Sequence, residues 1–406
     1  MKYRLLPLKD AGAGFNTLFG VLLALLALGL GAVGYMEHHG HIVTGMNNQV
    51  VWGLPHVFAV FLVVAASGAL NMASMASVFG KTDYKPLAPV SGVLAIALLI
   101  GGLMVLMLDL GRPDRLIVAM THMNFKSIFA LNIFLYSGFV GFVVAYLWTM
   151  LEHRMHRYTP LAGLAAFVWR MALTTGTGSI FGFIVARQAY DSALLAPLFI
   201  ALSLSYGLAV FIPMLMALCQ TSGRPLGDTV VARLARLQAI FIAAGFYFVL
   251  VYHLTNLYFT KHHDFERFIL LDGGAYTALF WLGQVLLGTM LPFALLLHPR
   301  IGALRARVVV AAVAVVLGGL AQMAVTIIGG QAFGLVLFPG YAVSSSFADG
   351  VHAAYSPSVP ELLLGLGGVA LVGIIVMLAV RVMGFLPDRL DDASLGLPST
   401  TEPAAA

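Results

Sequence analysis

The chain has 406 residues, of which 60% are hydrophobic and only 10% are charged, and its mean hydropathy is +0.95. A soluble domain carries about 25% charged residues, so this composition excludes a soluble globular protein and predicts an all-α, polytopic membrane helix bundle. The net charge of +5 does not indicate nucleic-acid binding, because basic residues in such a chain mostly mark cytoplasmic loops. The single cysteine, Cys219, excludes a disulfide framework, a four-cysteine zinc site and an iron–sulfur cluster held by this chain alone.

Ten apolar stretches are each long enough to cross about 30 Å of hydrocarbon. They lie near residues 15–36, 54–79, 87–109, 127–151, 160–187, 193–219, 232–260, 273–297, 306–328 and 361–385. With a cytoplasmic N-terminus, most of the 22 basic residues fall on the inner side, so the positive-inside rule predicts that both termini are cytoplasmic. Residues 1–390 are predicted to form one transmembrane domain, and 391–406 a disordered cytoplasmic tail. A secretory signal is the alternative for the first stretch, but no clear cleavage site follows it.

The third stretch ends in a run of charges, Leu108-Asp109-Leu110-Gly111-Arg112-Pro113-Asp114-Arg115. The helix is predicted to stop at Asp109, because glycine commonly follows a helix end and proline cannot continue a helix. Ionised groups beside hydrocarbon are costly and are usually retained for a function, so Asp109 is a candidate proton acceptor. The loop from Asp109 to Lys126 is predicted to lie outside, where the positive-inside rule disfavours its basic residues. Their use is either charge compensation for Asp109 or the docking of an outer partner.

His56 opens the second stretch, directly after Trp52 and Pro55, and is therefore predicted at the same depth as Asp109. A neutral imidazole can donate a hydrogen bond to a carbonyl oxygen and can exchange protons near physiological pH. The alternative is an interfacial histidine that bonds a neighbouring loop. Tyr136, in the fourth stretch, is added to this candidate site on its depth and chemistry alone.

Arg170 follows Pro160 by ten residues, which places it roughly 15 Å from the inner surface at 1.5 Å per residue. An arginine at that depth must face the bundle interior or a hydrated cavity. Thr174 and Thr177 follow in the same stretch and Tyr206 in the next, so a proton path through the inner half is one interpretation. Hydroxyl groups that bond the backbone of their own helix are the other.

Two other classes of protein fit parts of this pattern. A haem b cytochrome needs facing imidazoles, and His56 with His253 is the intramembrane pair at similar predicted depth. A secondary transporter of an anionic substrate suits ten spans with a midplane arginine, but it requires internal repeats, which the two halves of the sequence do not show. Co-purifying subunits and a visible spectrum would distinguish these classes.

Residues 52–151 contain three motifs that occur together in a known family. They are Trp52-Gly53-Leu54-Pro55-His56, the small-residue run Ala65-Ala66-Ser67-Gly68-Ala69-Leu70, and the Asp109 run followed by Asn124-Phe125-Lys126-Ser127. This pattern resembles the NrfD/PsrC family, the membrane subunits of quinone-linked oxidoreductases, and the ten-span length resembles its HybB-like branch. Residues 53–80 and 109–127 look most like members that serve dissimilatory sulfur metabolism.

The resemblance implies a helical subunit of the bacterial inner membrane that holds neither haem nor an iron–sulfur cluster. It also implies that menaquinone or ubiquinone binds near the outer face, and that a periplasmic ferredoxin-like iron–sulfur subunit docks there, alongside haem-containing membrane and cytochrome subunits. The family's acidic residue before Gly-Arg-Pro matches Asp109, and its early histidine matches His56. With Arg112 to stabilise developing negative charge, these residues and Tyr136 form the predicted quinone site. Arg115, Lys126 and Arg187 are the predicted docking residues, and no metal site is expected.

Overall fold

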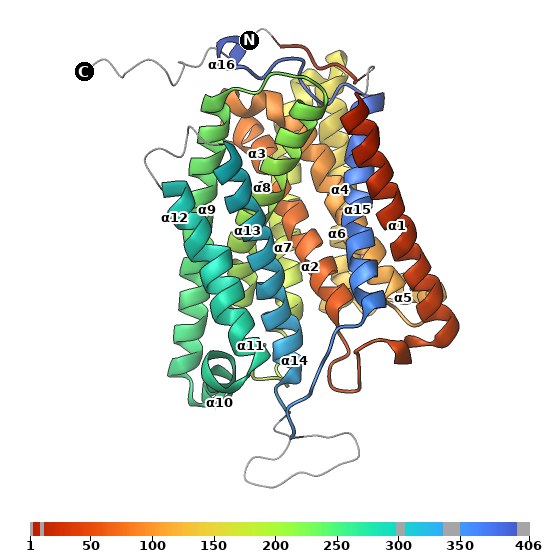
Figure 1. Cartoon of the computed structure of the whole chain (residues 1–406), viewed down its shortest axis with the longest axis vertical. Helices are drawn as coiled ribbons and strands as arrows, with labels where there is room; N and C mark the ends of the chain where they lie inside the picture. The colour runs from red at the N-terminus through yellow and green to blue at the C-terminus, as the bar shows by residue number, and fades with distance from the viewer. Residues whose placement is uncertain (1–2, 9–11, 298–304, 336–349, 396–406) are drawn as a thin grey trace, which may run out of the picture.

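The computed structural model describes residues 3–8, 12–297, 305–335 and 350–395, and this part of the chain is helical without β-strands. The helices stand roughly side by side in one bundle (Figure 1). The long elements are α1 (Ala13–His39), α2 (Leu54–Ala69) continued by α3 (Asn71–Ser77), α4 (Ala88–Leu108), α6 (Ile128–Leu151), α7 (Thr159–Gly182), α8 (Leu195–Thr221), α9 (Asp228–Tyr258), α11 to α12 (Ala275–Leu297), α13 to α14 (Arg305–Ala332) and α15 (Val359–Val382). Three short helices, α5 (Leu116–Thr121), α10 (His263–Arg267) and α16 (Asp392–Leu395), lie at the ends of the bundle.

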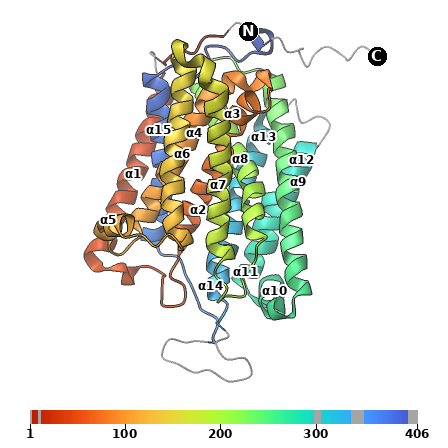
Figure 2. The same cartoon turned by 180° about the vertical axis from the view of Figure 1, so that it is seen from behind.

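Nine helices in the described residues are long and apolar enough to cross a membrane, and they coincide with nine of the ten predicted spans. The tenth predicted span is α7, a 24-residue helix that packs between α6 and α8 (Figure 2). It is less apolar than the others because Arg170 and several threonines interrupt its hydrophobic sequence. The all-α, polytopic architecture predicted from composition is therefore confirmed.

Residues close to the two termini lie at the same end of the bundle, as an even number of crossings requires. The guanidinium of Arg224 donates to the carbonyl oxygens of Leu6 and Leu386, which ties residues near both termini to the end of α8. The predicted disordered tail is partly ordered, because Asp392 of α16 accepts a hydrogen bond from the backbone N–H of Thr229. Residues 396–406 of that tail lie outside the described residues.

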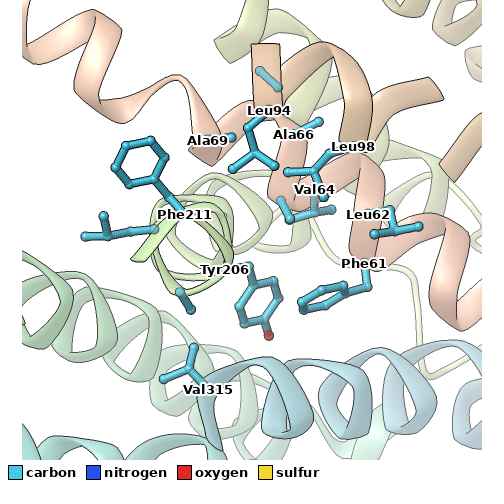
Figure 3. Close-up of a cluster of buried hydrophobic side chains, with 14 of the residues drawn as sticks. Phe61, Leu62, Val64, Ala66, Ala69, Leu94, Leu98, Tyr206, Phe211 and Val315 are labelled. Atoms are coloured by element: carbon cyan, nitrogen blue, oxygen red, sulfur yellow. The ribbon is translucent and has the colours of Figure 1, made fainter. Parts of the chain in front are cut away.

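Helix α2 occupies the centre of the bundle and packs against α4, α7, α8, α13 and α15. Its side chains join those of α4, α8 and α13 in a continuous apolar core (Figure 3). The backbones of α2 and α8 touch where Gly68 meets Gly207. A Cβ atom built on Gly68 would lie 1.6 Å from the carbonyl oxygen of Ser203. Only glycine permits this crossing, as in other membrane helices that meet at small residues.

The helix pair α11 to α12 is interrupted by a long π-helical stretch, Leu279–Met290. π-Helical turns are rare, usually short and often found at functional sites, because they rotate the side chains that follow. Here the hydroxyl of Thr289 donates to the carbonyl oxygen of Gln284, five residues earlier. Gly288 in this stretch packs against the backbone of Gly318 on α13. One face of the stretch, with Phe280 and Gln284, is buried in the second half of the bundle, formed by α8, α9, α11 to α12 and α13, while Leu282 and Leu286 are exposed on its outside.

Candidate functional site

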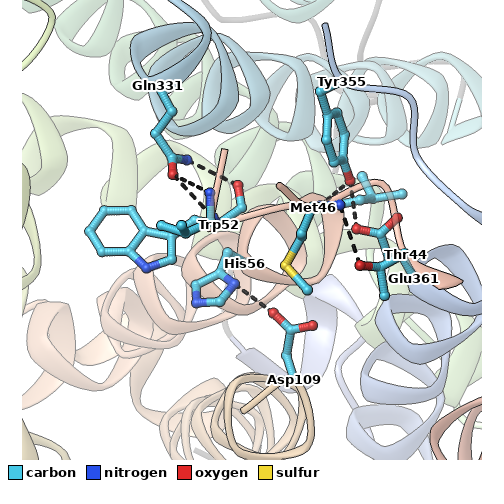
Figure 4. A network of polar contacts seen from close by, with 10 residues as sticks. Thr44, Met46, Trp52, His56, Asp109, Gln331, Tyr355 and Glu361 are labelled. Carbon is cyan, nitrogen blue, oxygen red and sulfur yellow. Dashed lines mark hydrogen bonds and ion pairs between the residues drawn. The ribbon is translucent and has the colours of Figure 1, made fainter. Parts of the chain in front are cut away.

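His56 and Asp109 meet where α2 begins and α4 ends (Figure 4), at the end of the bundle opposite the termini (Figure 1). Helix α2 begins at Leu54 with Pro55 in its first turn, and α4 ends at Leu108 with Asp109 as its C-terminal cap. Nδ1 of His56 lies 2.7 Å from Oδ2 of Asp109, and the two side chains are 13% and 0% exposed. Among the described residues, neither carboxylate oxygen of Asp109 nor Nδ1 of His56 makes a hydrogen bond of regular geometry, so the pair is a close contact of imidazole and carboxylate. The sequence prediction that these two residues form a pair at one depth agrees with this geometry.

An apolar cavity of about 250 Å³ lies beside the pair, between α2, α6 and α7. Its wall includes His56 but not Asp109, so the carboxylate is behind the imidazole as seen from the cavity. Tyr136 and Asn132, one helical turn apart on α6, also line it, together with Thr177 of α7. The remaining wall is hydrophobic and aromatic: Trp52, Ala59, Val60, Val63, Leu106, Leu110, Phe129, Ile133, Ile180, Phe181 and Ile327. The cavity can therefore hold a flat apolar molecule with polar groups at one side.

Asn132 is a polar residue of this cavity that was not predicted from the sequence. Its side-chain Nδ2 donates to the carbonyl oxygens of Ile128 and Gly176, which fixes its orientation. Its Oδ1 is buried and has no hydrogen-bond partner among the described residues, so it is free to accept a hydrogen bond from a bound molecule. The signal that could have found it is an asparagine inside an apolar span, four residues before Tyr136.

Two polar networks fix the start of α2. Oε1 of Gln331 accepts hydrogen bonds from the backbone N–H groups of Val51 and Trp52, and its Nε2 donates to the carbonyl oxygen of Trp52. Trp52 is thereby held with its ring stacked on His56, at a centroid distance of 6.0 Å. Gln331 was not predicted from the sequence, because only the folded chain brings it within reach of residues about 280 positions earlier.

The second network joins α2 to α15 (Figure 4). The backbone N–H of Leu54 donates to the hydroxyl of Tyr355, which in turn donates to Oε1 of the buried Glu361. The other oxygen of Glu361 accepts hydrogen bonds from the backbone N–H groups of Gly45 and Ser358. Burial raises the pKa of Tyr355, so its hydroxyl stays protonated and keeps this position. These contacts leave the imidazole of His56 facing the cavity and Asp109.

The structure does not bring Arg112 to the cavity, which corrects the prediction that it stabilises charge on a quinone. The turn at Pro113 directs its guanidinium to solvent, where it forms a bidentate pair with Asp114 at 2.9 and 3.0 Å. The hydrogen bond from Arg112 lowers the pKa of Asp114. Arg115 and Lys126 are exposed at the same end of the bundle.

Arg187 is engaged within the chain, which argues against its predicted role in docking. Its guanidinium donates to the carbonyl oxygens of Gln331 and Gln49. These hydrogen bonds join the loop after α7 to Gln331 and to the segment before Trp52. Partial burial lowers the pKa of this arginine. Its contribution to the candidate site is therefore structural and indirect.

The predicted proton path through the inner half is not continuous. Arg170 is 3% exposed, and its guanidinium donates to the carbonyl oxygen of Ser67 and to Oδ1 of Asn71, both on the α2 to α3 span. The hydroxyls of Thr174 and Thr177 bond the carbonyl oxygens four residues earlier in α7, the alternative that the sequence left open. Arg170 thus joins α7 to the central span.

Tyr206, the fourth predicted residue of the path, packs on Phe61 and on Gly319 of α13. It therefore belongs to the second half of the bundle, whereas Thr177 belongs to the cavity beside His56. The two hydroxyl groups face different cavities, so the structure divides the predicted residues between two sites.

His56 and His253, the two histidines considered as haem ligands, each face a different carboxylate. Nδ1 of His253 lies 2.8 Å from Oε2 of Glu266, at the end of α9 opposite the termini. In the described part of the chain, no cluster of three or more histidine, cysteine, aspartate or glutamate side chains could hold a metal ion.

Fold and site together define a multi-pass integral membrane protein with a buried imidazole–carboxylate pair beside an apolar cavity. The chain belongs to the NrfD family: residues 42–335 match the family model described as "Polysulphide reductase, NrfD". That match covers both motifs that position His56 and Asp109. The family expected from the sequence motifs is therefore confirmed.

Similar proteins come from archaea and bacteria. The chain is 29% identical over 372 residues to the Hdr-like menaquinol oxidoreductase integral membrane subunit of Archaeoglobus fulgidus, covering 91% of this chain and 93% of the relative. It is 26% identical to a putative dimethyl sulfoxide reductase membrane subunit of Halobacterium salinarum, over 91% of this chain and 92% of the relative. It is 24% identical to a selenate reductase subunit of Mesobacillus selenatarsenatis, over 89% of this chain and 91% of the relative. Each relative is named as a subunit of an oxidoreductase, and the two archaeal ones are named as membrane subunits.

Proposed function

We propose that the chain is the quinone-binding membrane subunit of a multi-subunit oxidoreductase and passes electrons between a quinone and a partner subunit. The observation that carries this proposal is the His56–Asp109 pair at one end of the bundle, whose imidazole lines an apolar cavity while the carboxylate lies behind it. Quinones are flat and apolar, and their oxygens take up or release protons whenever the ring is reduced or oxidised. The name of the Archaeoglobus fulgidus relative, a menaquinol oxidoreductase subunit, supports the same chemistry and favours menaquinone over ubiquinone as the substrate.

We assign different roles in proton exchange to the residues in and behind the cavity wall. Oxidation of the quinol gives two electrons to the partner subunit and releases two protons, one from each hydroxyl. His56 takes the proton of the hydroxyl that faces it, and the second proton leaves to water at the mouth of the cavity; quinone reduction is the reverse. Asp109 does not touch the substrate, and it stabilises the imidazolium that forms on His56. Before proton transfer the pair carries the negative charge of a buried carboxylate, and afterwards it is neutral overall. Oδ1 of Asn132 and the hydroxyl of Tyr136 hold the other polar groups of the quinone.

The partner that receives the electrons is proposed to be a periplasmic ferredoxin-like iron–sulfur subunit. Arg115 and Lys126 lie at the cavity's end of the bundle together with the exposed apolar side chains of Ile117, Val118 and Phe125. This combination of charge and exposed apolar area fits a protein partner. The chain then acts, in this proposal, in the bacterial cytoplasmic membrane beside haem-containing membrane and cytochrome subunits, as a counterpart of DsrP of the sulfur-metabolism complex DsrMKJOP. Proton translocation is part of this proposal.

Filling the cavity tests the location of the quinone. The variant Val60→Trp places an indole in the cavity. It is expected to raise the Kd of a menaquinone analogue at least about tenfold, which corresponds to a loss of about 1.4 kcal/mol of binding free energy. The measurement is a titration of the purified complex with the analogue. The matched control is Val168→Trp, at a position of α7 that is 58% exposed on the outside of the bundle. Equal affinities in the two variants would place the quinone elsewhere.

A further inference from the structure

The end of α9 opposite the termini carries a second imidazole–carboxylate pair that quinone chemistry at His56 does not use. Nδ1 of His253 lies 2.8 Å from Oε2 of Glu266, and the side chains are 13% and 0% exposed. These values repeat the burial of His56 and Asp109. A carboxylate without any exposed surface is costly to keep ionised, and an ionisable residue in a membrane bundle is by default a candidate functional group.

Hydrogen bonds that lead from Glu266 through Asn256 to His262 fix the orientation of the Glu266 carboxylate. Its Oε1 accepts a hydrogen bond from Nδ2 of Asn256 at 2.8 Å, and Oδ1 of Asn256 lies 3.1 Å from Nδ1 of His262 in the short turn Thr260–His262. Burial lowers the pKa of His262, so this ring is neutral at pH 7 and donates to Asn256.

Few charged groups surround Glu266. The titratable side chains that face it are Tyr252 and His253 on α9 and His262, with Lys261 and the partly exposed Asp191 beyond them. Its own short helix also carries His263, Asp264 and Arg267, which are exposed to solvent. His253 is therefore the group in direct contact that can compensate the charge of Glu266. A proton on His253 makes the net charge of the pair zero.

On its inner side the pair adjoins a cluster of polar side chains in the middle of the second half. The ring of Phe280 packs on His253 at a centroid distance of 4.8 Å, and Gln284 follows Phe280 on the same π-helical stretch. Val249, one turn before His253 on α9, lines the same small cavity as Gln284. The pair and the cluster are therefore one helical turn apart on two neighbouring helices.

The cluster has more polar atoms than protein partners. Gln284 is 4% exposed, and neither its Oε1 nor its Nε2 has a hydrogen-bond partner among the described residues. Oε1 of Gln238 is also unpaired, while its Nε2 donates to Ser205 at 2.9 Å. An unpaired buried amide costs a few kcal/mol, so such groups bind water. The adjoining cavity of about 30 Å³, which Tyr206 and Gln322 also line, has room for one or two waters by the usual volume criterion.

We propose that His253 and Glu266 form a second proton-binding site, which exchanges protons with water held by Gln284 and its neighbours. An excess proton that reaches this water from solvent moves on to the imidazole, which leaves the water neutral and makes the pair neutral overall; the proton later leaves towards the outer surface. The proposal rests on the proposed function, because quinol oxidation at the His56 site supplies the free energy for this movement. The proton path therefore runs through the second half of the bundle in this proposal, and not along α7 as the sequence pattern predicted.

The test uses the complete complex in lipid vesicles and measures quinol oxidation and released protons in the same assay. In Glu266→Gln we expect quinol oxidation within about twofold of the wild type and a proton yield reduced to the stoichiometric yield of quinol oxidation. Gln284→Leu, which replaces the water ligand by an apolar side chain of similar size, is expected to lose the same extra protons. The control Asp191→Asn removes a partly exposed carboxylate at the same end and is expected to keep the wild-type yield.

Two outcomes separate the inference from the proposed function. A wild-type proton yield in Gln284→Leu, or in an assembled Glu266→Gln complex, overturns the second proton-binding site and leaves quinone binding untouched. If Glu266→Gln does not assemble, Gln284→Leu decides alone. Failure of the proposed function looks different, because the wild-type complex would then oxidise no quinol at all.

Discussion

Replacing Asp109 with Asn is expected to lower quinone-coupled turnover at least about 100-fold, the usual contribution of a positioned acid–base group. The amide keeps the size of the side chain but removes the charge that stabilises protonated His56, whose Nδ1 lies 2.7 Å from the carboxylate. Because Asp109 does not line the cavity, affinity for a menaquinone analogue is expected to stay within about twofold. Steady-state turnover and analogue titration of the same purified complex measure both quantities.

The matched control is Asp114→Asn, five residues further along the same loop. Asp114 is exposed and paired only with the exposed Arg112, so its replacement is expected to leave turnover unchanged. Co-purification of the partner subunits shows that each variant complex is assembled. Wild-type turnover in an assembled Asp109→Asn complex would contradict the role assigned to the pair. A loss of analogue binding instead of turnover would show that Asp109 only shapes the cavity.

The pair was predictable because local rules act at both of its residues. Gly111 and Pro113 follow the end of α4 at Asp109, and Pro55 lies in the first turn of α2 directly before His56. The lengths of the apolar segments therefore placed both residues at one depth. The same rules predicted the bundle, since each span is a separate apolar helix. The two residues are far apart in the sequence, but this did not hinder the prediction. The depth of a residue in the membrane follows from its position along its own apolar helix.

The direction in which a side chain points around its helix axis, and the contacts between loops, cannot be predicted from the length of an apolar segment. Arg112 is close to Asp109 in sequence, yet the turn at Pro113 points it to solvent, and Arg187 is used to hold two loops together. Gln331 contacts the start of α2 only because α13 to α14 passes beside it. The π-helical stretch that carries Gln284 also cannot be recognised from the spacing of its hydrophobic residues. The sequence pattern therefore favoured a proton path at Arg170, a charged residue inside an apolar segment.

The crossing of α2 and α8 predicts the largest effect on stability. Alanine normally stabilises a helix relative to glycine by up to about 1 kcal/mol. At Gly68 the added Cβ would lie 1.6 Å from the carbonyl oxygen of Ser203, so the two backbones must separate and the core around them must open. We expect Gly68→Ala to destabilise the protein by about 3 kcal/mol or more, the upper range for overpacking, and to lower the yield of assembled complex.

Gly141→Ala on α6 is the matched control, because a Cβ there meets nothing within 4 Å. Thermal unfolding in detergent is expected to give an unchanged or higher Tm for Gly141→Ala and a clearly lower Tm for Gly68→Ala. Similar Tm values for the two variants would mean that α2 and α8 do not touch at this point. Because α2 carries His56 at its other end, a displaced crossing is also expected to move the imidazole relative to Asp109. Residual Gly68→Ala complex should therefore lose turnover as well as stability.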